Sequence, residues 1–153
     1  MNLDELVTEH FTLAEMLRSE AASRLGLDNI PESEAIIANI KKTCGALELV
    51  RAYYNKPLIV LSCHRSPEVN QAVGGSKSSA HMKGLAADFR IPGTPNIEIC
   101  SAISALGIDF DQIIYEFGEP GWVHLGLSDN PRGQILSAVK EGSHTVYTQG
   151  LVQ

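Results

Sequence analysis

The most informative stretch of the chain is residues 79–88, which read Ser-Ala-His-Met-Lys-Gly-Leu-Ala-Ala-Asp. His81 and Asp88 stand seven residues apart, with several small residues between them. Gly84 lets the backbone turn, and the two alanines before Asp88 leave room beside a ligand or another strand. Imidazole nitrogen and carboxylate oxygen are both good zinc ligands. The stretch therefore predicts part of a metal site, which needs a third ligand from elsewhere.

The segment Trp122-Val123-His124-Leu125 offers that ligand on a predicted strand, 36 residues past Asp88. Two histidines and one carboxylate leave a fourth coordination position open for water, as catalytic zinc requires. Position alone does not decide the matter. A histidine in a strand-rich segment is more often a packed or surface residue, and an aspartate can lie at the exposed end of a strand.

The rest of the chain divides into a helical part and a strand-rich part. Thr12 and Glu15 form a capping box, and apolar residues recur at helical spacing after Ser33. We expect helices over about 13–25, 33–54, 67–74 and 94–106. Helices followed mainly by antiparallel strands are typical of the α+β class, with N-terminal helices packed on a small central antiparallel sheet.

The strand signals lie mostly in the second half. Residues 58–61 are wholly apolar and predict a buried strand, and residues 85–91 predict another. Residues 113–117 and 122–127 flank a four-residue turn and predict a hairpin. Weaker strand patterns cover 134–139 and 145–147.

Composition and charge exclude several classes of protein. Hydrophobic residues make up 44% and charged residues 20% of the 153 residues, an ordinary globular balance, and we expect one domain over 1–153. The formal charge of −6 is spread without long basic runs, which argues against nucleic acid as a partner. No apolar run approaches the roughly 18 residues that span a bilayer, so we expect no stable membrane association.

The N-terminus and the cysteines bear on the cellular compartment. The first residues carry no basic segment followed by an apolar one, so we expect no secretory signal and a chain that is cytoplasmic at synthesis. Cys44, Cys63 and Cys100 are an odd number at wide spacing, so they predict buried thiols rather than a disulfide framework or a C-x-x-C metal site.

The informative stretch and the later histidine together match a known pattern. The pattern is Ser79-x-His81-x-x-Gly84-x-Ala86-x-Asp88, followed by Trp122-x-His124. It closely resembles the signature of the D-Ala-D-Ala carboxypeptidase family, which includes bacterial zinc carboxypeptidases and phage L-alanyl-D-glutamate endopeptidases. The resemblance extends from Phe11 to the hairpin after Asp111. It implies a D-Ala-D-Ala carboxypeptidase-like, hedgehog-like fold in which His81, Asp88 and His124 bind one zinc ion.

The resemblance also implies roles for residues around the metal. Arg65 matches an arginine that holds substrate, and its guanidinium suits a peptide carboxylate. Ser79 either hydrogen-bonds the substrate or a metal ligand, or it only caps its loop. The chain departs from the family pattern before Arg65, where Ser62-Cys63-His64-Arg65 stands for the usual Ser-Gly-Tyr/Phe-Arg. Loss of the glycine can alter the turn, and we interpret His64 as a substitute for the aromatic residue.

The catalytic base is the second departure. Several family members carry an acid three residues before the last histidine, where this chain has Gly121. Glu116 and Glu119 are the remaining candidates, with Glu116 preferred and Glu119 the second choice. A regular four-residue hairpin would turn Glu116 away from His124, because side chains alternate across a sheet, whereas a bulge would reverse this.

These observations lead to one main hypothesis and one alternative. The chain is expected to be a monomeric, zinc-dependent peptidase that hydrolyses peptidoglycan stem peptides, as a phage-type endolysin or a cell-wall carboxypeptidase or endopeptidase. An endolysin would act on the cell wall after lysis or release. The alternative is a catalytically inactive, zinc-bearing module that binds the cell wall or a protein. A carboxylate within hydrogen-bond reach of the metal-bound water separates the two.

Overall fold

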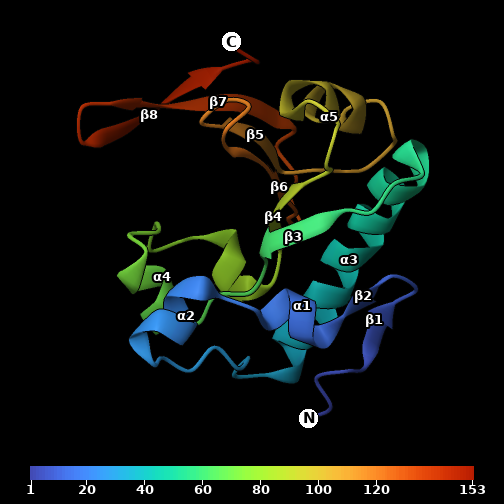
Figure 1. Ribbon diagram of the computed structural model, residues 1–153, viewed down its shortest axis with the longest axis vertical. Helices are drawn as coiled ribbons and strands as arrows, with labels where there is room; N and C mark the ends of the chain where they lie inside the picture. The colour runs from blue at the N-terminus through green and yellow to red at the C-terminus, as the bar shows by residue number, and fades with distance from the viewer.

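The computed structural model describes all of residues 1–153. Its helices are α1 (Leu13–Leu17), α2 (Glu20–Leu25), α3 (Glu34–Tyr54), α4 (Pro67–Ala72), the 3-10 turn η1 (Ala80–Lys83) and α5 (Asn96–Ile103). Its strands are β1 (Leu6–Thr8), β2 (Phe11–Thr12), β3 (Ile59–Ser62), β4 (Ala86–Arg90), β5 (Gln112–Glu116), β6 (Trp122–Gly126), β7 (Gln134–Glu141) and β8 (His144–Gln149). Figure 1 shows the N-terminal helices on one side and the β7–β8 hairpin projecting from the other. No helix combines the length and the apolar character that crossing a membrane requires.

The main sheet has six strands in the order β3-β4-β6-β5-β7-β8, and β1 and β2 form a separate small pair. The predicted α+β class is confirmed. All neighbours in the main sheet are antiparallel except β5 and β7, which run parallel. The parallel pair arises because β7 follows β6 but pairs with β5 on its far side. The sheet is therefore mixed, although most of its pairs are antiparallel.

The N-terminal helix predicted over 13–25 is wrong in its continuity. The Thr12 side chain does accept a hydrogen bond from the Glu15 N–H, so the predicted cap is present. The helix stops at Arg18, whose backbone is extended and whose guanidinium donates to the Val60 carbonyl in β3. Ser19 then caps a new helix through its hydroxyl. A second capping residue and a tertiary hydrogen bond therefore outweigh helical periodicity here.

One face of the main sheet carries the core. Its inward side chains pack in a single cluster with apolar side chains of α3 and α5, and these sheet residues include Val60, Phe89, Ile113, Val123 and Leu125. The prediction of a wholly buried strand at 58–61 is wrong in part, because Ile59 and Leu61 are each 44% exposed. β3 is an edge strand, so only alternate residues reach the core. The opposite face of the sheet holds the candidate site.

Candidate metal centre

Register places two of the predicted ligands side by side on the open face of the sheet. Asp88 in β4 lies opposite His124 in β6, and His124 lies opposite Ile114 in β5. Directly opposed residues point to the same face of a sheet. The neighbours of Asp88 and His124 along their strands, Ala87 and Leu125, are fully buried in the core on the other face. The alternation of the two strands therefore aims both ligands away from the core.

His81 arrives from η1, the turn that precedes β4. The Ser79 hydroxyl accepts a hydrogen bond from the His81 N–H and caps the turn, as one of the two readings of Ser79 requires. Gly84 ends the turn at a φ of 73°, a left-handed conformation, and packs against Ile36 and Ile40 of α3. A side chain at position 84 would collide with that helix. The glycine in the pattern is therefore required for both conformation and space.

The three candidate ligand atoms converge. Nε2 of His81 lies 3.4 Å from Oδ2 of Asp88, and Nδ1 of His124 lies 2.9 Å from Oδ1 of Asp88. One ligand atom from each residue falls within 4.8 Å of the others. The two histidines are buried, whereas Asp88 keeps some exposure toward the open face. Two imidazoles and a carboxylate that meet at one partly accessible point are the donor set of a catalytic zinc site.

Hydrogen bonding orients His81 for this task. Its Nδ1 lies 2.7 Å from the Cys63 carbonyl, an acceptor, so Nδ1 carries the proton and Nε2 is left to face Asp88. Burial alone would raise the pKa of Asp88, but His81 and His124 outweigh it and hold that pKa below its ordinary value. The carboxylate is thus ionised at neutral pH, the state in which it binds a metal.

Arg65 reaches the centre from the loop after β3, and its backbone is held on three sides. The Asn29 amide donates to the His64 carbonyl and accepts from the Ser66 N–H, while the Arg65 N–H donates to the His81 carbonyl. The guanidinium lines the same cleft as the candidate ligands. Burial lowers the pKa of Arg65, and the charges of Asp88 and Glu116 act in the opposite direction. The loop therefore presents a fixed cation beside the metal centre.

The departure at Cys63 and His64 does not disturb this loop. Only Asn55 and Phe117 among the non-glycine residues have a positive φ, so the chain does not need glycine at position 63. His64 is 2% exposed, and neither ring nitrogen has a hydrogen-bond partner. Burial lowers the pKa of His64, which keeps the ring neutral. It packs as an aromatic ring would, in agreement with the interpretation from the sequence.

The hairpin between β5 and β6 does not have the regular register. Glu116, rather than Phe117, lies opposite Trp122, and Tyr115 lies opposite Val123. Phe117 leaves the strand in a left-handed conformation with a φ of 62°. This lengthens the loop by one residue, and a shift of one residue moves every side chain to the other face. Glu116 therefore shares a face with His124, and its Oε1 lies 3.7 Å from the His124 Nδ1.

Gly121 explains why the acid stands elsewhere. A Cβ at position 121 would collide with the backbone carbonyl of Glu116. No side chain, and hence no carboxylate, fits there without a change in the loop. Burial and the charge of Asp88 raise the pKa of Glu116 to about 7, while His124 acts in the opposite direction. The carboxylate nearest to the metal ligands is therefore Glu116.

Glu119, the second candidate base, points to a different place. Its carboxylate accepts from the Asn96 N–H at 2.6 Å, the Ile97 N–H at 3.1 Å and the Tyr115 hydroxyl at 2.6 Å. Asn96 and Ile97 begin α5, which has no side-chain cap of its own because Pro95 precedes it. Glu119 thus caps a helix from a distant loop. It lies outside the cleft that contains the metal centre.

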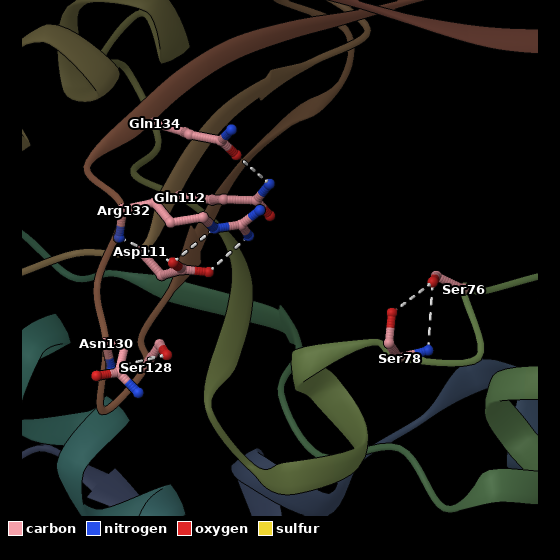
Figure 2. A network of polar contacts seen from close by, with 8 residues as sticks. All are labelled: Ser76, Ser78, Asp111, Gln112, Ser128, Asn130, Arg132 and Gln134. Atoms are coloured by element: carbon pink, nitrogen blue, oxygen red, sulfur yellow. Dashed lines mark hydrogen bonds and ion pairs between the residues drawn. The ribbon is translucent and has the colours of Figure 1, made fainter.

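The centre opens into a cleft of about 740 Å³. The cleft brings together Arg65, Ser79, His81, Asp88, Glu116 and His124. One rim is polar: Asp111 pairs with Arg132, and Gln112 donates to Gln134. Figure 2 shows this rim on one side and the loop with Ser76 and Ser78 on the other. A separate cavity of about 530 Å³ beside Phe117 and Val139 contains none of the candidate ligands.

Comparison with known proteins gives one match. The family model described as Peptidase M15 matches residues 9–126, which is most of the chain. The chain belongs to the M15 peptidase family. A comparison with curated proteins finds no match. M15 peptidases are zinc-dependent, and membership implies peptidase activity on peptidoglycan-related substrates. The resemblance stated from the sequence is confirmed.

The donor set of this M15 chain fits a zinc ion. His81, Asp88 and His124 offer two imidazole nitrogens and one carboxylate oxygen, and the Cys63 carbonyl orients the ring of His81. Sequence reasoning missed the part of the cleft built by β7 and β8, where Lys140, Thr145 and Tyr147 line the wall. The predicted strands at 134–139 and 145–147 included Thr145 and Tyr147 but ended before Lys140, and no local signal indicated that β7 pairs with β5.

Proposed function

We propose that this M15 chain is an active zinc metallopeptidase that hydrolyses the stem peptides of peptidoglycan. The observation that carries the proposal is the position of Glu116, which lies on the same face of the sheet as His124 and 3.7 Å from it. A carboxylate at that place is what separates a working peptidase from a zinc-bearing binding module. The alternative of an inactive module loses its main support, the missing acid at position 121.

The residues divide the chemistry between them. His81, Asp88 and His124 would hold a zinc ion, which would act as a Lewis acid and make water a nucleophile near neutral pH. Glu116 accepts the proton of the attacking water and later delivers it to the leaving amine. Arg65 pairs with a carboxylate of the stem peptide and fixes the peptide in the cleft. Ser79 supports His81 through its backbone.

The finer role remains part of the same proposal. A phage-type endolysin and a cell-wall carboxypeptidase or endopeptidase use the same metal chemistry and differ in the bond that is cut. The cleft extends past the metal centre along β7 and β8, where Lys140, Thr145 and Tyr147 line it. This favours an endopeptidase, because the product on each side of the scissile bond has room to extend. We propose that the chain acts as a monomer on the cell wall.

The test is the digestion of purified sacculi. Zinc-loaded protein is incubated with sacculi, and new peptide ends are identified by mass spectrometry, with His81→Ala and Glu116→Gln as matched controls. We expect new ends from the parent protein and none from either variant, and their masses name the bond. Intact sacculi with a protein that still binds zinc would overturn the proposal in favour of the binding module.

A further inference from the structure

The β7–β8 hairpin extends the floor of the cleft beyond the part of the chain that matches the family. The match ends at residue 126, and β7 begins at Gln134. Ala138 in β7 lies beside Glu116 in β5, and Tyr147 in β8 lies opposite Ala138. These residues form one row across the sheet on the face that carries His124. The hairpin thus adds two strands to the substrate-facing surface.

Lys140 stands at the outer end of this surface. Its ammonium donates to the Thr145 hydroxyl at 3.2 Å and lies 5.4 Å from the centre of the Phe117 ring. No acidic side chain pairs with it. Lys140 and Tyr147 line the cleft, and Tyr147 is 55% exposed although it is a large aromatic residue. A positioned, unpaired cation beside an exposed aromatic ring is a surface suited to an acidic peptide.

Three cations line the cleft, and the two that have no acidic partner by ion pairing, Arg65 and Lys140, flank the metal centre, whereas Arg132 pairs with Asp111. Arg65 follows β3, the candidate ligands lie on β4 and β6, and Lys140 lies on β7, in a sheet ordered β3-β4-β6-β5-β7-β8. His124 is level with Leu136 of β7, two strands away, and Lys140 lies four residues further along β7. With neighbouring strands about 4.8 Å apart and a rise of about 3.3 Å per residue, the Cα atoms of Lys140 and His124 are on the order of 16 Å apart. An extended peptide advances about 3.5 Å per residue, so Lys140 faces a position about four or five residues from a bond held at the metal centre.

We propose that Lys140, supported by Thr145 and Tyr147, forms a subsite for a carboxylate of the bound peptide on the other side of the metal centre from Arg65. The proposal rests on the proposed function, since it assumes that a stem peptide occupies the cleft. It predicts a preferred substrate class, which is peptides that carry two free carboxylates several residues apart. A peptide whose distal carboxylate is amidated lacks the partner of Lys140.

The test measures binding without turnover. Trp122 is the only tryptophan and lines the cleft, so its fluorescence reports on peptide binding to zinc-loaded protein that carries Glu116→Gln. The probes are synthetic cross-linked stem peptides, long enough to extend from the metal centre to Lys140, in which one carboxylate at a time is replaced by a carboxamide. We expect replacement of the carboxylate that pairs with Lys140 to raise the Kd about fivefold, which corresponds to the free energy of a solvent-accessible ion pair.

Three further substitutions in this background assign that preference. Lys140→Met should abolish it, Lys140→Arg should retain it, and Lys42→Met should leave it unchanged. Lys42 is the matched control because it is an exposed lysine on α3, outside the cleft. The subsite is overturned if every preference for a carboxylate over a carboxamide persists in Lys140→Met. It is also overturned if no pair of peptides shows such a preference in the parent protein. If the peptides bind as expected but the sacculi of the digestion test stay intact, the proposed peptidase activity is refuted and the subsite is not.

Discussion

Glu116 and Glu119 lie three residues apart, yet the first lies beside His124 and the second caps α5. Gln substitutions at the two positions test the different roles proposed for them. Glu119→Gln removes the carboxylate that accepts hydrogen bonds from the Asn96 and Ile97 N–H groups at the start of α5 and from the Tyr115 hydroxyl. Loss of a helix cap costs about 0.5–2 kcal/mol. At about 2–4 °C per kcal/mol for a chain of this size, we expect a fall in melting temperature of about 1–8 °C. Hydrolysis of stem peptides should remain.

Glu116→Gln should have the opposite profile. The side chain accepts no proton once it is an amide, so kcat should fall by roughly 10²–10⁴-fold, the usual share of a general base. Its melting temperature in metal-free protein should be unchanged or higher, because burial and Asp88 already raise the pKa of Glu116 to about 7 and disfavour its charge. Zinc binding should persist, since the three ligands are untouched.

The assay for both variants is thermal unfolding by circular dichroism together with kcat and KM on a synthetic stem peptide. Asp109→Asn serves as a control for the loss of one charge outside the cleft. Loss of activity in Glu119→Gln with an unchanged melting temperature would show that Glu119 acts in catalysis and would refute its role as a helix cap. Retention of kcat in Glu116→Gln would refute the role of Glu116 as the general base.

Three other outcomes follow from the same geometry. Zinc at about 100 times its Kd should stabilise the protein by about 2.7 kcal/mol, measured as a thermal shift. A chelator should reverse the shift, and His81→Ala should show none. The pKa of Glu119 is lowered because its hydrogen bonds outweigh the effect of burial. The ionised side chain therefore stabilises the fold above about pH 4.3, and this stabilisation is lost as the pH falls through the pKa of the folded state. The urea midpoints of the parent and of Glu119→Gln should differ at neutral pH and converge in acid. Gly121→Ala should disrupt the hairpin and lower both stability and activity, since the new Cβ would collide with the Glu116 carbonyl. Gly45→Ala is the matched control: a Cβ at this position of α3 meets no neighbouring atom, and the free energy of unfolding should rise by up to about 1 kcal/mol.

The helices and the first two candidate ligands could be predicted from local sequence, whereas His124, 36 residues past Asp88, was assigned through the family resemblance. A capping hydroxyl, a helical repeat and the pairing of His81 with Asp88 seven residues on are visible without any knowledge of distant contacts. The same local signals failed at Arg18, where a hydrogen bond to β3 and a second cap divide one expected helix into two. Local preference is weak compared with a tertiary contact of this kind.

The orientation of Glu116 and the wall of the cleft were decided only by the tertiary structure. Whether Glu116 faces His124 depends on a single left-handed residue, Phe117, and sequence reasoning left a regular hairpin and a bulge both open. Asn96 in α5 donates to carbonyls of the loop and so helps to hold it in place from far along the chain. The sequence by itself determined which residues could bind a metal. Register and strand order, which depend on contacts between distant segments, determined that Glu116 lies beside the candidate ligands and that Lys140 lines the cleft they open into.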